Sequence, residues 1–508
     1  GSARLYLNGS EVAAGAVRTD FPTANALTLG LLGGGNGWRG GLDAVRIIGR
    51  ALSAAEIAAL YAADGGNRAP AIAAVTLNAA ALVGGTVTLS ADVSDPDGDP
   101  LRLRVEWGDG ASSSGAPPAL THAYAAPGRY QVRLRVDDGV ATTAAADRLI
   151  VVHHPLTAAA PTSSATIVHD RSRNRLWTAN VDDASVSRLD AANRTRLGVH
   201  AVGAEPMALA LAPDGARVWV ACAGSGELRV LSAVDGAALL TVPLPPGARP
   251  SGLAFAPNGG ALFVALHSTG ELARLDPASG AITARLRLAP PGASGPRGVA
   301  VRADGARVLV SRFLSADDGG AVWEVDAAAM TLIRTHALPL DADSSDGSSG
   351  GRGLPNQLMS AAISPDGRRA WVPGKKDNIL RGAFRDGQAL TFETSVRSLL
   401  AQIDLGATGG ETARLDLDNR SAATAVAFSP RGDLAYVAMA LNEEVTVLDT
   451  ATGNRVAAFA VAQAPDGLCL SADGGTLWVH RFLGPAVTAF DVRGIAAGTA
   501  SEPIALGA

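Results

Sequence analysis

Three aspartates at alternate positions are the first residues whose types and spacing suggest chemistry. Asp95, Asp97 and Asp99 lie in the stretch S-D-P-D-G-D-P and offer the carboxylate oxygens that calcium prefers. Together with Glu106 they fall on positions one, three, five and twelve of a calcium loop, but Pro100 stands where an EF-hand needs glycine. The spacing excludes an EF-hand and leaves two interpretations, a looser calcium site or a turn capped by aspartates.

A pair of lysines is the second feature, because every other basic residue of the chain is an arginine. Lys375 and Lys376 are the two lysines among 43 Lys and Arg residues. We expect them on a loop, where they join a basic patch that docks an acidic partner or an anion. The alternative is a solvated loop whose charges are neutralised by Asp341, Asp343 and Asp346. The residues predicted to contact a partner are Lys375, Lys376, Arg312, Arg481, His480, Arg352 and Arg297.

Catalytic motifs are missing from the sequence in any proper context. It has no G-x-S-x-G, H-E-x-x-H or phosphate-binding loop, and no C-x-x-C-H for a covalently attached haem. His480, with Asp182 and Asp183 on another expected loop, is too small a set to predict a catalytic site. Cys222 and Cys469 are the two cysteines, and we expect both to be free thiols.

The composition indicates which elements must position these residues. The 508 residues include 59 Gly and 28 Pro, which indicates many turns and β structure in several domains. A net charge of −5 predicts no nucleic-acid partner. No apolar run approaches the ~18 residues of a membrane span, and the N-terminus shows no signal peptide.

The first zone, residues 1–68, alternates like strands in R-L-Y-L-N-G and L-D-A-V-R-I-I and then predicts a short helix. Ser53 is the expected N-cap, Glu56 closes a capping box, and Ile57, Leu60 and Tyr61 form one apolar face. The order L-Y-L-N-G, G-W-R-G-G-L-D-A-V-R-I and A-L-S-A-A-E-I-A-A-L-Y resembles the end of a laminin-G-like, concanavalin-A-like jelly roll. The resemblance implies a truncated jelly roll.

The second zone, residues 69–154, carries V-E-W-G-D-G, T-H-A-Y-A-A-P-G-R-Y and V-R-L-R-V-D-D-G. Alternation in L-R-L-R-V-E-W places Trp107 in a core, with Tyr124 and Tyr130, and the arginines outside. Over its full length this zone resembles a PKD domain, which implies an immunoglobulin-like sandwich.

The third zone, residues 155–508, repeats with a period in the low forties. A turn and a large apolar residue recur, an aspartate or serine ends a later strand, and a proline precedes most units. Four short strands per unit and seven units predict a seven-bladed β-propeller. The three columns are Trp177, Trp219, Phe263, Leu309, Trp371, Tyr436 and Trp478; Asp190, Ser232, Asp276, Asp326, Asp404, Asp449 and Asp491; and Pro161, Pro206, Pro250, Pro296, Pro355 and Pro465.

Two insertions interrupt this repeat. Residues 340–355 enter the fifth unit, and residues 375–398 separate its second and third strands, with S-L-L-A-Q-I-D expected as the third strand. Both are predicted on one face, above one blade, and long loops in a compact fold are usually functional or disordered.

The repeat S-P-D-G-x-x-x-W/Y-V-A…V-x-V-x-D resembles the YVTN family of bacterial propellers. The stretch W-V-P-G-K-K-D-N-I-L-R-G…L-T-F-E-T-S-V-R-S is also similar to propellers that precede c-type, di-haem peroxidase-like domains in exported bacterial proteins. The chain is thus expected to be all-β, secreted, periplasmic or on the cell surface, and non-catalytic, with a protein or glycan partner. The alternatives are the propeller of a redox protein whose haem domain lies beyond residue 508, and a propeller lactonase or lyase.

Overall fold

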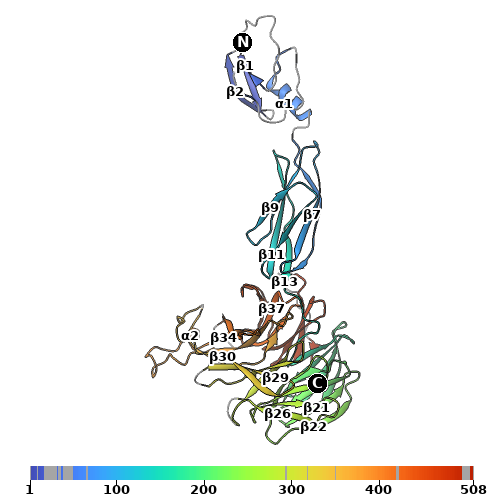
Figure 1. Ribbon diagram of the computed structural model, residues 1–508, viewed down its shortest axis with the longest axis vertical. Helices are drawn as coiled ribbons and strands as arrows, with labels where there is room; N and C mark the ends of the chain where they lie inside the picture. The colour runs from blue at the N-terminus through green and yellow to red at the C-terminus, as the bar shows by residue number, and fades with distance from the viewer. Residues whose placement is uncertain are drawn as a thin grey trace. The chain divides into compact units, whose positions relative to one another are not determined.

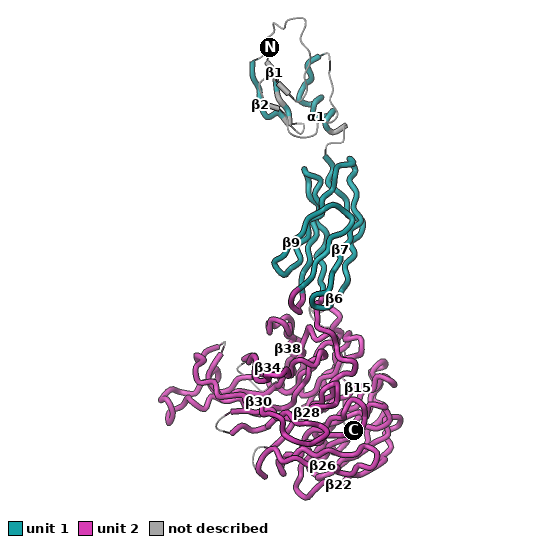
Figure 2. The backbone as a smooth tube through the Cα atoms, viewed as in Figure 1, with its two compact units in different colours: residues 1–124, 130–150 teal, residues 125–129, 151–508 magenta. Residues whose placement is uncertain are grey.

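The computed structural model divides into two compact units (Figure 2), residues 1–124 with 130–150 and residues 125–129 with 151–508. Strands dominate both units (Figure 1), so the prediction of an all-β protein is confirmed. The residues that the structure describes are 2–7, 10–16, 31–32, 36–37, 48, 50–63, 67–291, 295–316, 319–348, 350–418, 423–494 and 504–506.

The helix predicted in the first zone is present as α1, Ala54–Ala63. Its capping box is formed, because the backbone N–H of Glu56 donates to Ser53 Oγ at 3.2 Å and that of Ser53 donates to the Glu56 carboxylate at 2.8 Å. Most of the G-W-R-G-G-L-D-A-V-R-I stretch lies outside the described residues. The strands described in this zone are β1 (Ser2–Leu7), β2 (Ser10–Ala16), β3 (Leu31–Leu32) and β4 (Asn36–Gly37).

The second zone forms two antiparallel sheets, β10-β7-β5 and β6-β13-β11-β8-β9 with β12 beside β11. Trp107 and Tyr124 are buried, as the alternation predicted, and the Tyr124 hydroxyl donates to the Trp107 carbonyl at 2.9 Å. Tyr130 is half-buried and stacks on Tyr124. The strands are β5 (Ala71–Leu77), β6 (Ala80–Leu82), β7 (Thr86–Ser94), β8 (Arg102–Glu106), β9 (Ser112–Gly115), β10 (Ala119–Ala123), β11 (Gly128–Asp137), β12 (Thr142–Ala144) and β13 (Arg148–His153).

The third zone folds into seven consecutive antiparallel sheets within its described residues, which we number sheet 1 to sheet 7. The predicted aromatic column lies on the second main strand of each sheet, and its tryptophans are buried. Sheets 1 to 3 consist of β15 (Ile167–Asp170), β16 (Arg175–Asn180), β17 (Ser185–Asp190) and β18 (Thr195–Ala201); β19 (Pro206–Leu211), β20 (Arg217–Cys222), β21 (Glu227–Ser232) and β22 (Ala238–Pro243); and β23 (Pro250–Phe255), β24 (Leu262–Leu266), β25 (Glu271–Leu275) and β26 (Ile282–Arg287).

Sheets 4 to 7 follow the same plan, with additional short strands in sheets 4 and 5. Their strands are β14 (Thr162–Ser163), β27 (Pro296–Val301), β28 (Arg307–Arg312), β29 (Gly319–Asp326) and β30 (Thr331–Pro339); β31 (Leu354–Asn356), β32 (Ala362–Ile363), β33 (Arg369–Asp377), β34 (Val396–Asp404) and β35 (Gly410–Asp418); β36 (Ala423–Phe428), β37 (Leu434–Met439), β38 (Glu444–Asp449) and β39 (Arg455–Ala460); and β40 (Pro465–Leu470), β41 (Thr476–Arg481), β42 (Ala486–Asp491) and β43 (Ile504–Ala505).

The inner strands of the sheets meet one another in chain order and close on themselves. β15 contacts β19, β19 contacts β23, β23 contacts β27, β27 contacts β32, β32 contacts β36, β36 contacts β40, and β40 contacts β15. Apolar clusters fill the spaces between neighbouring sheets, for example sheets 2 and 3 and sheets 6 and 7. The result is a closed ring whose inner wall consists of strands from every sheet.

A segment before sheet 1 lies inside this ring. The β14 residues Thr162 and Ser163 pair with the inner strand β27, and Ala165 forms a bridge with Leu209 of sheet 2. The Ser164 backbone N–H donates to the Val299 carbonyl at 2.8 Å. Residues of this segment, Ser163 and Ala165 among them, line two separate cavities within the ring.

Candidate functional site at one end of the ring

A cavity of about 320 Å³ opens at one end of the ring. Its lining comes from residues in and next to the inner strands, from residues that follow the second strands, such as Val181, Ala440 and Phe482, and from residues 163–166. Arg297 and Asp466 are the two charged residues among the described residues of the lining. The other polar groups are hydroxyls, and the apolar groups include Met207, Met359 and Leu468.

A repeated irregularity in the inner strands directs side chains into this cavity. In β19, β23, β36 and β40 the strand register skips the residue that follows the first paired residue, and in β27 it skips from Pro296 to Val299. A β-bulge of this kind re-aims a side chain. The skipped residues that line the cavity are Met207, Ser251, Arg297, Thr424 and Asp466.

The guanidinium of Arg297 has no hydrogen-bond or ion-pair partner among the described residues. It lies over the ring of Phe313, with Cζ 5.1 Å from the centroid, which is the geometry of a cation–π contact. Burial lowers the pKa of Arg297, although the Asp466 charge acts in the opposite direction. Arg297 is half-buried, and because its guanidinium forms no ion pair in the described structure, it has unused capacity for an anion.

Asp466 faces the same cavity and is held from behind by His480. The distance between Asp466 Oδ1 and His480 Nδ1 is 2.5 Å, and His480 is buried. His480 is not among the lining residues of the cavity, and its Nε2 has no hydrogen-bond partner in the described structure. It therefore acts on the cavity through Asp466.

Two other predicted residues lie near this end of the ring. In the strand register Arg312 pairs with Pro296, and Arg481 pairs with Pro465. Both are half-buried, and burial lowers the pKa of Arg481. Neither lines the cavity.

The lysine pair has a different environment from the one predicted. Lys375 and Lys376 lie on the strand β33, which continues to Asp377 because it pairs with β34 along its full length. Lys376 is 2% exposed, and its Nζ lies 3.0 Å from Asp341 Oδ2 and 2.8 Å from Asp416 Oδ2. Lys376 is thus a buried, paired cation and does not belong to an exposed patch.

The two insertions over sheet 5 are joined by ion pairs, which confirms that they lie side by side. Asp346 of the first accepts hydrogen bonds from Arg352, and from Asn378 and Arg381 of the second. Arg352 also pairs with Asp386 at 2.8 Å. Burial opposes the effect, but these hydrogen bonds hold the pKa of Asp346 well below its usual range. We call Asp341, Asp346, Arg352, Lys376, Asn378, Arg381, Asp386 and Asp416 the insertion network.

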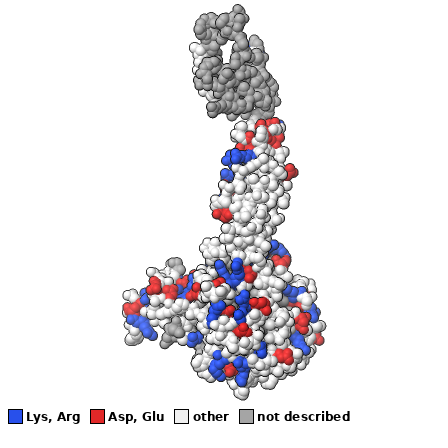
Figure 3. Space-filling view, viewed as in Figure 1, with Lys and Arg blue, Asp and Glu red and all other residues white. Residues whose placement is uncertain are grey.

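The seven predicted partner-binding residues therefore fall into two groups. Lys375 pairs with Asp377 at 2.9 Å, and Lys376 and Arg352 belong to the insertion network. Acidic and basic residues lie side by side on the face of this unit shown in Figure 3. The basic side chains do not form one patch; the other four, Arg297, Arg312, His480 and Arg481, lie at sheets 4 and 7.

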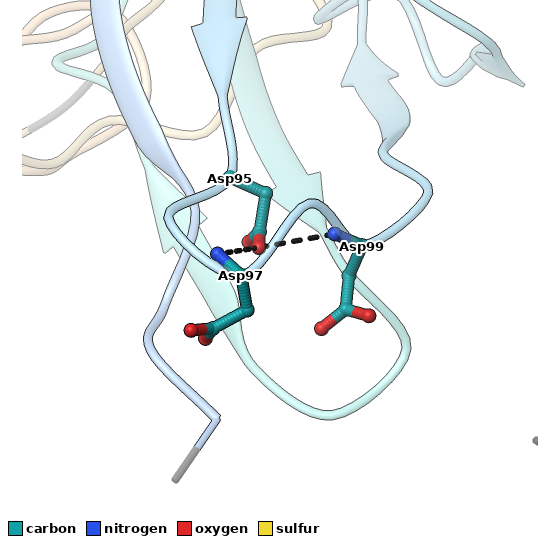
Figure 4. A group of neighbouring side chains, drawn as sticks. All are labelled: Asp95, Asp97 and Asp99. Carbon is teal, nitrogen blue, oxygen red and sulfur yellow. Dashed lines mark hydrogen bonds between the residues drawn. The ribbon is translucent and has the colours of Figure 1, made fainter. Parts of the chain in front are cut away.

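The predicted calcium residues lie together on the turn after β7 (Figure 4). Candidate ligand atoms of Asp95, Asp97 and Asp99 lie within 4.8 Å of one another. Asp95 Oδ1 accepts the backbone N–H groups of Asp97 at 2.8 Å and Asp99 at 3.2 Å, while Arg68 pairs with Asp97 at 2.8 Å. Hydrogen bonds from Arg68 lower the pKa of Asp97. The three aspartates thus cap the turn, and their carboxylates also form a cluster of the kind that suits a hard cation.

The thiols are free, as predicted. Cys222 is buried and Cys469 is half-buried. Burial raises the pKa of Cys222 to about 11, which keeps this thiol protonated and unreactive.

Comparison with known families identifies the two N-terminal zones. The family model for the PKD domain matches residues 67–151, and that of the concanavalin A-like lectin/glucanases superfamily matches residues 1–58. Both domain types are typical of extracellular proteins. No curated protein matches the chain. Among the described residues, no helix is long and apolar enough to cross a bilayer.

Solved structures resemble the larger part of the chain. The hydrazine synthase of Kuenenia stuttgartiensis is 18% identical, covers 67% of this chain and 98% of its own, and has a TM-score of 0.56. A functionally unknown protein from Desulfotomaculum acetoxidans DSM 771 is 13% identical over 68% of this chain and 95% of its own, with a TM-score of 0.47. The dihydro-heme d1 dehydrogenase NirN is 18% identical over 80% and 73%, with a TM-score of 0.44. At these identities the likeness to hydrazine synthase concerns the fold alone.

Proposed function

We propose that residues 155–508 form a seven-bladed β-propeller, following residues 1–68 and 69–154 as separate domains. The support is the cyclic contact order of seven inner strands and the matching repeat in the sequence. In this arrangement the cavity lies at one mouth of the central channel, a place where propellers commonly bind ligands.

We further propose that the chain is a non-catalytic binding protein, secreted, periplasmic or on the cell surface, that recognises a carboxylate on its partner at this cavity. The unpaired guanidinium of Arg297 carries this proposal, since arginine binds carboxylates through two parallel hydrogen bonds. The sequence predicted that a basic surface patch contacts an acidic partner. The proposal assigns this contact to one side chain, Arg297. A lactonase or lyase needs converging acid and base groups, and Asp466 is the one acidic or basic side chain beside Arg297 in the described lining.

Two further expectations stay proposals. Calcium binding is supported by the proximity of Asp95, Asp97 and Asp99. A c-type haem domain as partner is supported by the sequence resemblance around residues 371–404.

Calorimetric titration with benzoate tests the binding proposal. We expect wild type to bind benzoate and Arg297→Gln to lose at least tenfold in affinity. Arg385→Gln is the matched control, because Arg385 is exposed on the second insertion, outside the cavity lining. Equal binding by wild type and Arg297→Gln would contradict the proposal.

A further inference from the structure

The two charged groups of the cavity lie on opposite walls. Arg297 belongs to sheet 4 and Asp466 to sheet 7, which are three steps apart, the largest separation that a ring of seven sheets permits. They form no ion pair with each other in the described structure, although the charge of Asp466 acts on Arg297 and raises its pKa against the effect of burial. Each of the two side chains can therefore form further hydrogen bonds with a ligand in the space between them.

The carboxylate of Asp466 is oriented for a ligand of positive charge. Its Oδ1 is bound by His480, and no hydrogen bond to Oδ2 is formed by the described residues. The contact with His480 fixes the orientation of the Asp466 carboxylate. The next residue, Gly467, leaves space for Thr166, because a Cβ on Gly467 would lie 2.0 Å from Thr166 Oγ1. Thr166 Oγ1 is buried and has no partner among the described residues. The cavity thus presents a carboxylate and an unpaired hydroxyl near one wall.

The formal charge of the described lining is zero, since Arg297 and Asp466 cancel. A simple anion satisfies Arg297 but leaves Oδ2 of Asp466 without a partner in the described structure and is repelled by the Asp466 charge. A ligand with a carboxylate at one end and an ammonium at the other satisfies both groups. The lining thus favours a zwitterion over an anion.

The places of the two charges in the ring bear on the length of the ligand. A single amino acid carries both charges on one carbon atom, whereas Arg297 and Asp466 belong to sheets three steps apart, which favours a longer ligand. A peptide extends by about 3.3–3.6 Å for each residue. The cavity of about 320 Å³ offers Met207, Met359 and Leu468 for side chains.

We infer that the cavity binds a short peptide with both termini free, its carboxylate on Arg297 and its ammonium on Asp466. This inference rests on the proposed binding of a carboxylate by Arg297 and adds the ligand class and the second contact. No atom of the peptide is changed, so the activity is binding without turnover.

Calorimetry on the full chain tests the inference with alanine, dialanine and trialanine, and with N-acetylated and C-amidated trialanine. We expect trialanine to bind more tightly than alanine. N-acetylation of trialanine should weaken its binding to wild type at least tenfold. It should change the binding to Asp466→Asn little, because this variant lacks the carboxylate that contacts the ammonium. C-amidation of trialanine should weaken its binding to wild type at least tenfold. It should change the binding to Arg297→Gln little, because this variant lacks the guanidinium that contacts the carboxylate.

The outcomes separate the inference from the proposed function. If acetyl-trialanine binds as tightly as trialanine, the role of Asp466 is wrong while carboxylate binding survives. If no peptide binds, the inference is overturned, and the benzoate titration decides the proposed function independently. If the amide binds as tightly as the free peptide, the carboxylate contact itself is refuted.

Discussion

Two cations of the third zone, the buried Lys376 and the half-buried Arg297, differ in how their charge is satisfied. Lys376 lies between Asp341 and Asp416, and further ion pairs of the insertion network, around Asp346, join the two insertions. Arg297 lies in the ring cavity without such a partner. A buried cation between two carboxylates maintains structure, whereas a half-buried cation that lacks them is available to a ligand. The presence or absence of neighbouring carboxylates therefore distinguishes the structural role of Lys376 from the proposed binding role of Arg297.

The largest expected effect concerns the paired cation. Lys376→Met leaves two carboxylates without their cation, and removing one partner of a buried ion pair costs about 3–5 kcal/mol. Urea unfolding of the full chain, with the β33 amides followed by hydrogen exchange, measures this loss. Lys375→Met is the control on the neighbouring position, where a partly exposed pair with Asp377 contributes less than about 1 kcal/mol. Equal losses for both variants would show that the insertion network does not stabilise the fold.

Acid should weaken the same region. Burial raises the pKa of Asp341, but hydrogen bonds from Lys376 and Ser344 outweigh it and lower this pKa to about 2. The folded value lies below the unfolded value of about 3.9, so the stabilisation is complete above pH ~4 and is lost as the pH falls towards 2. The loss is on the order of 2 kcal/mol. Unfolding of wild type and Lys376→Met between pH 5 and 2 should show this step in wild type alone; an identical step in the variant would contradict it.

A smaller effect is expected at the support of the cavity. His480→Phe removes the hydrogen bond to Asp466 and should lower the unfolding free energy by about 1 kcal/mol. Because Asp466 is then free to turn, trialanine should bind several-fold more weakly, while benzoate binding should change little. His169→Phe, a change in sheet 1 outside the cavity lining, serves as the control for both measurements. An unchanged affinity for trialanine would remove the positioning role of His480.

The smallest effect concerns the aspartates of the PKD domain. If the site resembles weak extracellular calcium sites, with a dissociation constant on the order of 1 mM, calcium at roughly 5 mM raises stability by about 1 kcal/mol. Hydrogen exchange of β7 and β8 with calcium and with EDTA measures this gain, which Asp95→Asn should abolish. Equal protection in both solutions would leave the turn as aspartate capping supported by Arg68.

Local patterns in the sequence predicted the elements well and the cavity poorly. The aromatic column predicted the second main strand of each sheet, and Ser53 and Glu56 predicted the start of α1, because both signals depend on neighbours in the chain. Lys376 was expected on a loop because the extension of β33 depends on pairing with β34, far along the chain. Arg297 was selected, but Asp466, the other charged residue of the cavity lining, was missed. The signal available was the residue after the repeated proline, which includes both Arg297 and Asp466.

The most direct test of the central claim measures stability and binding on the same variant. In Arg297→Gln the affinity for trialanine should fall at least tenfold, while the unfolding free energy should stay within about 1 kcal/mol of wild type or rise, since a half-buried charge without an ion-pair partner is removed. Unchanged affinity, or a loss of stability as large as that of Lys376→Met, would contradict the account.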